Sequence, residues 1–265
     1  MRLRRLTIQA PATTAGYYAE IEASTTTLAG LLATRGATLA VPACPGWSLG
    51  DLTAHLGRVH RWAAGIVTGR PTGATSGSAA VASPAADDPG LGSWLTSGAA
   101  GVIAAIRAAG DEPAWAFGGQ RPASFWARRM SHESMVHRAD AELAAGQEPV
   151  LAPDLAADAI DEWLRITAWR RGDTDPRADA LPAGAALHVH ARPGAKDRGS
   201  GEWLVSHEPA GVTIQTSHAK ADVAISGPAD RLLLVLLRRL PPDDPAVTVH
   251  GDRGLLDRWL ARTPF

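Results

Sequence analysis

The sequence predicts two domains of different class: an N-terminal four-helix bundle over residues 1–172 and a smaller α+β domain over 180–265. Three observations support this prediction. Through the first 170 residues, apolar side chains recur every three or four positions, as they do on amphipathic helices. Beyond residue 185, apolar and polar residues alternate in short runs, as they do in strands. Between the two regions, segment 171–185 is rich in Gly, Pro, Asp and Ala and predicts a linker.

The helices of the first domain are predicted from apolar spacing and from end signals. The first is expected over Thr14–Arg35, and Ser48 with Asp51 three residues later forms a variant capping box that opens the second. A third helix is expected around 95–106, a fourth over about 123–145 ending at Gly146, and a fifth from Pro153. Segment 68–92 predicts a long mobile loop, and 111–122 predicts a turn.

The second domain is predicted to mix strands and helices. Alternating runs predict strands at 186–191, 202–208, 211–218 and 221–227. Gly227 and Pro228 introduce an apolar helix over 230–240, which a strand at 246–251 and a short helix at 254–260 follow. Helices first and an α+β segment afterwards indicate a division near residue 175.

Composition excludes several classes of protein. The net charge of −1 gives no reason to expect nucleic acid or an anionic membrane as a partner. No stretch approaches the roughly 18 apolar residues of a membrane span, and the arginine-containing start lacks the apolar run of a signal peptide. Cys44 is the only cysteine, so an intramolecular disulfide is impossible. We expect a cytoplasmic protein, and its oligomeric state is left open.

The fourth helix carries the most informative pattern. Trp126, Met130, Glu133, His137 and Ala141 fall on one stripe, which places two possible metal ligands in the row that faces the core. A buried carboxylate is costly unless it is paired or bound to a cation, and helical bundles place metals between facing helices.

His55 is the candidate third ligand, because it lies between Leu52 and Val59 at helical spacing. Two histidines and one carboxylate leave an open position at a zinc ion, and the same set suits iron, nickel or manganese. The plainer interpretation pairs Glu133 with Arg129 on a solvated face and makes His55 a core histidine. His60 and His132 are weaker candidates, since neither shares a stripe with the neighbouring ligand.

Two blocks carry a family resemblance. CPGWSLGDLTAHLGRVHRW (44–62) and HESMVHRADAELAAG (132–146) resemble the hallmark blocks of the mycothiol-dependent maleylpyruvate isomerase family, within the DinB/YfiT-like metalloproteins. The resemblance implies a DinB-like bundle in which His55, Glu133 and His137 bind zinc, followed by a sterol-carrier-like α+β domain. It also implies Arg239 as a catalytic residue; where the family carries a Gly-Arg pair, this chain has Arg238 and Arg239.

The resemblance implies a metalloenzyme with Zn²⁺, or another divalent metal, and mycothiol as its thiol. The metal would hold the thiol as a thiolate, which adds to an electrophilic small molecule. Release of the thiol after bond rotation gives an isomerase and its retention gives an S-transferase; both outcomes stay open. The alternative from another class is a non-catalytic module that binds a small molecule or a protein partner.

Three further sets of residues have chemistry that suits a functional site. Cys44 precedes the second helix with no base identifiable near it, which favours a structural role over that of a nucleophile. Arg129, one turn before Glu133, is a candidate for binding the cofactor or an anionic substrate, and Arg128 is less well placed. His188 and His190 share a strand face, with His207 and His218 on later strands; they form either a second metal site or an ordinary polar face.

Overall fold

The computed structural model describes residues 13–69, 77–117, 119–169, 180–194, 199–209 and 211–263. The predicted linker falls largely on 171–179, outside the described residues. The described chain forms two compact units, 13–150 and 151–263. In the part that the structure describes, none of the helices has the length and apolar character needed to cross a bilayer.

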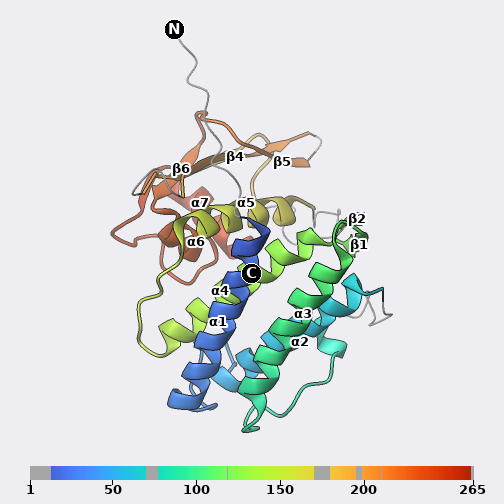
Figure 1. The fold of residues 1–265 in the computed structure, drawn as a ribbon. Coiled ribbons are helices and arrows are strands. Elements are labelled where there is room, and N and C mark those ends of the chain that lie inside the picture. The colour runs from blue at the N-terminus through green and yellow to red at the C-terminus, as the bar shows by residue number, and fades with distance from the viewer. Residues whose placement is uncertain are drawn as a thin grey trace. The chain divides into compact units, whose positions relative to one another are not determined.

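The first unit consists of four long helices and a small hairpin. The helices are α1 (Thr14–Arg35), α2 (Leu49–Val67), α3 (Leu91–Ala109) and α4 (Ser124–Ala144). Helix α2 packs on α3, and α1 packs on both α3 and α4 (Figure 1). Helix α1 has the predicted bounds, and α2 begins with the predicted capping box, in which the Ser48 hydroxyl accepts from the backbone of Asp51.

Two segments of this unit differ from the sequence predictions. The predicted turn at 111–122 is a hairpin of β1 (Pro113–Ala116) and β2 (Gly119–Pro122), in which Trp115 pairs with Gln120. Neither strand is long enough to show a clear alternation, so the pattern predicted only the turn. In the predicted loop, residues 77–90 include a 3-10 helix (Ser78–Ala80), and Arg58 of α2 donates to the Ser83 hydroxyl at 3.0 Å.

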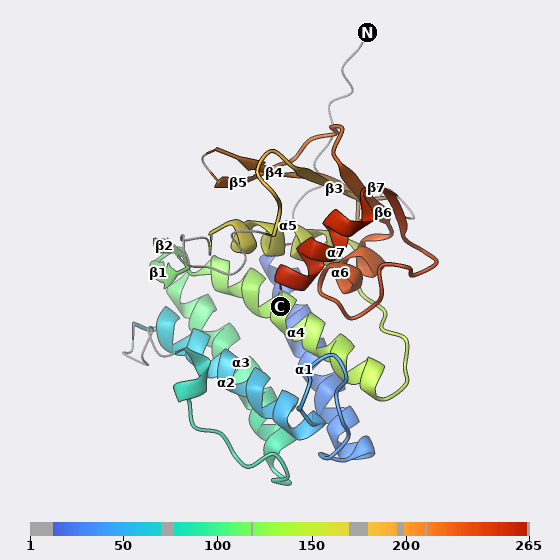
Figure 2. The same ribbon diagram turned by 180° about the vertical axis from the view of Figure 1, so that it is seen from behind.

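The second unit is a five-stranded sheet with three helices. Its elements are α5 (Pro153–Trp169), β3 (Ala186–Ala191), β4 (Gly201–Glu208), β5 (Gly211–Gln215), β6 (Val223–Gly227), α6 (Ala229–Leu236), β7 (Thr248–Gly251) and α7 (Arg253–Arg262). The strand order is β5-β4-β3-β6-β7, and only the β3–β6 pair is parallel (Figure 2). The strand and helix order follows the prediction, with shorter β5 and α6.

The division between the units lies earlier than the sequence predicts. Helix α5 was expected in the first domain, but it belongs with the sheet. It packs against α6, and its Asp161 accepts a hydrogen bond from the Trp203 indole of β4 at 3.1 Å. Asp154 accepts another from the backbone of Gly199 at 2.8 Å. Helical periodicity predicts that α5 is a helix but does not indicate which core its apolar face joins.

Helix α6 ends in a Schellman motif. The backbone N–H of Arg238 donates to Val235 at 2.9 Å, and that of Arg239 donates to Leu234 at 2.7 Å. This pattern places Arg238 at the position after the C-cap, where its φ of 62° lies in the left-handed region that favours glycine. Among the described residues, Arg238 is the only non-glycine with a positive φ.

We therefore expect Arg238→Gly to raise the free energy of unfolding by about 1 kcal/mol, because glycine adopts this conformation without the steric cost of a side chain. Urea denaturation measures the change. Arg238→Ala is the matched control, since it removes the guanidinium but keeps the Cβ atom that causes the strain. Equal stability of the two variants would show that backbone strain at residue 238 is not the cause.

Candidate metal centre

The candidate centre lies in the first unit, where α2 meets α4. Glu133 Oε1 lies 3.6 Å from His55 Nε2 and 3.4 Å from His137 Nε2. The three donor atoms lie within 4.8 Å of one another, and the two imidazole centroids are 5.1 Å apart. The structure thus brings together the three side chains that the sequence selects as ligands. That they bind a metal stays a prediction.

The separations suit a small divalent cation. Tetrahedral zinc with bonds of about 2.0–2.1 Å places neighbouring ligand atoms roughly 3.3–3.4 Å apart. The two nitrogen–oxygen distances at Glu133 are close to this value. The donor set also has the chemistry of a metal site, since a carboxylate oxygen and two imidazole nitrogens converge on one point. The residues present therefore fit the metal that the resemblance implies.

Burial differs among the three candidate ligands. Glu133 and His137 are buried, whereas the side chain of His55 is 23% exposed. The His55 ring packs against the Trp47 ring, with 4.9 Å between their centroids. Of the three candidate ligands, His55 is thus the one whose side chain is partly open to solvent.

Glu133 is held as a carboxylate by its neighbours. Burial by itself would raise its pKa, but Arg129, His137 and His55 together hold the pKa of Glu133 well below its usual range. The Arg129 guanidinium contacts Oε2, the carboxylate oxygen that does not face the histidines. The ion pair of the plainer interpretation is thus present, but it lies beside the two histidines rather than on a solvated face. Binding of a cofactor by Arg129 stays a prediction.

His137 is oriented by Asp140, a residue that the sequence pattern alone did not indicate. Its Nδ1 lies 3.0 Å from Oδ2 of the fully buried Asp140. Burial lowers the pKa of His137, but the hydrogen bonds to Asp140 and Glu133 outweigh it and raise the pKa. A proton on Nδ1 leaves the Nε2 lone pair directed toward Glu133, as ligation requires. The spacing of three between His137 and Asp140 was the signal that could have identified this pair.

Cys44 also lies beside Asp140. Its Sγ is 3.6 Å from Asp140 Oδ2, and Cys44, His137 and Asp140 form a second group with convergent donor atoms. The sequence identified no base near this cysteine, because 96 positions separate it from Asp140. The structure corrects that view: the thiol has a carboxylate partner to which it donates.

The two weaker histidine candidates do not join the centre. His60 is fully buried, its Nε2 lies 2.9 Å from the Ser134 hydroxyl, and burial lowers its pKa to about 3. The ring of buried His132 meets the Tyr17 ring edge-on at 6.0 Å. Both histidines are buried core side chains of the first unit.

Arg239 belongs to the second unit. It follows α6, and its guanidinium donates to the backbone carbonyl of Leu237 at 2.8 Å. The side chain thus satisfies a carbonyl left without a partner at the helix end. A catalytic role for Arg239 stays a prediction.

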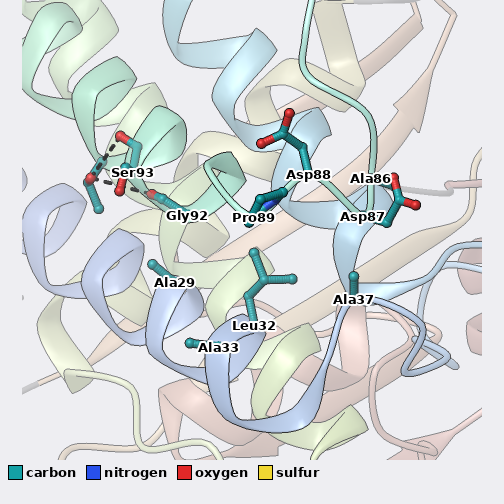
Figure 3. A pocket seen from close by; sticks show the side chains of 11 residues that line it. Ala29, Leu32, Ala33, Ala37, Ala86, Asp87, Asp88, Pro89, Gly92 and Ser93 are labelled. Carbon is teal, nitrogen blue, oxygen red and sulfur yellow. Dashed lines mark hydrogen bonds between the residues drawn. The ribbon is translucent and has the colours of Figure 1, made fainter.

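A pocket of about 490 Å³ lies elsewhere in the first unit, between the C-terminal half of α1 and the start of α3. Figure 3 shows Leu32 on one side of it and Asp87 and Asp88 on the segment before α3. None of the three candidate ligands lines this pocket. It is therefore separate from the candidate centre.

Two family models match the chain. The model described as the mycothiol maleylpyruvate isomerase N-terminal domain matches residues 18–142, and that of the MDMPI C-terminal domain matches 154–258. The boundary between the matches agrees with the division after residue 150. No curated protein sequence matches the chain.

Solved structures support the same assignment at the level of the fold. A mycothiol-dependent maleylpyruvate isomerase aligns with a TM-score of 0.55 and 14% sequence identity over 91% of this chain and 94% of the other. A histidine-to-alanine variant of such an isomerase aligns over the same shares with a TM-score of 0.56 and the same identity. A ubiquinone synthesis protein covers 41% of the chain with a TM-score of 0.31, which is too low to establish a shared fold. The sterol-carrier likeness stays a prediction.

Proposed function

The chain belongs to the mycothiol-dependent maleylpyruvate isomerase family, and on this premise we propose that it is a metalloenzyme that adds mycothiol to an electrophilic small molecule. The observation that carries the proposal is the position of Glu133 Oε1, 3.6 Å from the Nε2 atom of His55 and 3.4 Å from that of His137. The proposed ligands are these three residues, and the proposed metal is Zn²⁺ or another divalent ion. When bound there, the metal supplies a Lewis acid that favours the thiolate form of a small thiol at neutral pH.

The protein's own residues have distinct roles in this proposal. Asp140 holds the His137 ring in the tautomer that ligation needs, and Arg129 fixes the carboxylate of Glu133. In this proposal the thiol and its electrophile approach beside His55, whose side chain is 23% exposed. Arg129 is a candidate for contacting the cofactor, and Arg239 for orienting a substrate carboxylate by a two-pronged contact.

The isomerase and S-transferase reactions share the addition of the thiol and differ in the step that follows it. The thiol gives its proton to solvent, and its sulfur forms a bond to an electrophilic carbon of the substrate. If the carbon–carbon bond rotates and the carbon–sulfur bond then breaks, the thiol is recovered and the product is a geometric isomer. If the carbon–sulfur bond persists and the adduct takes up a proton or loses a leaving group, the product is an S-conjugate.

Cobalt substitution tests the proposal directly. Adding mycothiol to the Co²⁺-loaded chain is expected to produce near-ultraviolet absorption from thiolate-to-cobalt charge transfer, because the proposed site has a coordination position for sulfur. The His137→Ala variant should show no such band. An unchanged spectrum of the wild-type chain would refute the proposed metal–thiol chemistry. With maleylpyruvate as the electrophile, catalytic recovery of the thiol indicates an isomerase, and stoichiometric consumption indicates an S-transferase.

Replacement of Cys44 tests whether mycothiol or Cys44 supplies the nucleophilic sulfur. We expect Cys44→Ser to keep thiol-dependent turnover within about threefold of wild type, because the serine hydroxyl can still donate to Asp140 and mycothiol supplies the nucleophile. Steady-state kinetics with the metal content measured in parallel provides the check. A loss of turnover above about tenfold with the metal retained would instead assign the nucleophile to Cys44.

A further inference from the structure

A second group of histidines and a carboxylate lies in the C-terminal unit. Glu202 of β4 pairs across the sheet with His190 of β3, and His188 precedes His190 on the same face. His218 reaches this group from segment 216–222, which connects β5 to β6. Glu202 Oε2 lies 2.7 Å from His218 Nδ1 and 3.5 Å from His188 Nε2. One donor atom from each of these three residues lies within 4.8 Å of the other two.

His188 has an unsatisfied nitrogen aimed into this group. The residue is 6% exposed, and its Nε2 has no hydrogen-bond partner among the residues that the structure describes. A hydrogen bond to the backbone of Ser217 acts to raise the pKa of His188, as a carbonyl that accepts a ring N–H does. With that proton on Nδ1, Nε2 carries a lone pair that faces a carboxylate oxygen across 3.5 Å. Two acceptors at this distance repel each other unless a cation lies between them.

We propose that His188, Glu202 and His218 form a second divalent-metal site in this protein, with zinc as the metal. The three donors are two imidazole nitrogens and a carboxylate oxygen, as in the first centre, but they come from different strands of a different unit. A cation replaces the proton between His218 and Glu202 and satisfies the lone pair of His188. This site does not depend on the proposed reaction.

The chemistry of the ligand atoms indicates which metals this site would bind. Imidazole nitrogen favours zinc, copper, nickel or iron, whereas calcium and magnesium require oxygen ligands. His190 adds a fourth donor at the rim, since its Nε2 lies 3.3 Å from Glu202 Oε1. The side chain of His218 is 75% exposed, so metal enters from solvent without opening the sheet.

A metal bound at this site would link segment 216–222 to the sheet. His188 and Glu202 lie on adjacent strands, whereas His218 lies in a segment outside regular secondary structure. A metal shared by the three joins that segment to the sheet and lowers the free energy of the folded state relative to the unfolded chain.

Zinc titration of the untagged, full-length chain tests the inference. His137→Ala removes the proposed first centre, and this variant is expected to bind one equivalent of Zn²⁺. In the His137→Ala background, His218→Ala should weaken zinc affinity on the order of 100-fold or more. Glu202→Gln in the same background should have a similar effect. The exposure of His218 makes its replacement harmless to folding, which circular dichroism checks.

His250→Ala is the matched control, because it removes an exposed histidine from β7 of the same sheet, outside the cluster. It should leave zinc affinity unchanged. The inference is overturned if the folded His137→Ala variant binds no zinc, or if its affinity survives both His218→Ala and Glu202→Gln. A further outcome is that the wild-type chain binds a single equivalent of Zn²⁺ in total. If His218→Ala then abolishes that binding and His137→Ala does not, the result supports this site and refutes the first centre.

Discussion

Replacing Glu133 by glutamine is expected to weaken metal binding and lower thiol-dependent turnover by at least about 100-fold each, since even residues behind a ligand affect affinity by 10–100-fold. The amide has nearly the shape of the carboxylate, so the helix is preserved, but it removes the negative charge between two histidines. Metal analysis after dialysis and steady-state kinetics measure the two losses.

Helix α4 offers a matched control for this change. Glu142 pairs with Arg138 four residues earlier at 2.8 Å, just as Glu133 pairs with Arg129 four residues earlier. Glu142→Gln therefore removes the same charge from the same helix and breaks the same kind of ion pair outside the centre. It should leave metal content and turnover near wild type. Equal losses in both variants would show that helix stability, rather than ligation, causes the effect.

Asp140→Asn is expected to weaken metal binding about 10- to 100-fold while the fold persists. The carboxylate accepts the Nδ1 proton of His137, which keeps the Nε2 lone pair available. An asparagine can present its NH₂ group instead, which favours the opposite tautomer and places a proton on Nε2. Competition with a chromophoric zinc chelator measures the affinity.

Two variants separate the roles of Asp140. Cys44→Ser keeps Asp140 and its bond to His137, so its metal affinity should match wild type. In a His137→Ala background, Asp140→Asn should cause no further loss, because its effect passes through the His137 ring. An additive loss in the double variant would contradict this positioning role.

Local signals in the sequence predicted most helices, and together with the family resemblance they predicted that the three candidate ligands meet. The capping box at Ser48 fixes where α2 begins, and the buried residues Leu52 and Val59 then place His55 between them on the same helical stripe. Glu133 and His137 lie on the buried face of α4 for the same reason. These predictions succeeded because they depend on helical periodicity, which a single sequence displays.

The errors concern features that depend on distant parts of the chain. The membership of α5 in the second unit depends on partners such as Trp203, which is 42 positions from Asp161. The contact between Cys44 and Asp140 spans 96 positions and has no local signature. The left-handed backbone at Arg238 is a third case, because the pattern that marks it is usually a glycine and this chain has an arginine.

The pairing of Arg129 with Glu133 affects the order in which the molecule is assembled. The two residues are one turn apart in α4, so the pair forms as soon as that helix forms, which takes about a microsecond or less. Glu133 then has a compensating charge before α2 docks, and the newly synthesised chain can complete its fold before any metal arrives. On the proposed metal-dependent function, a cell starved of the metal would therefore accumulate folded but inactive protein. Restored supply would reactivate that existing pool without new synthesis.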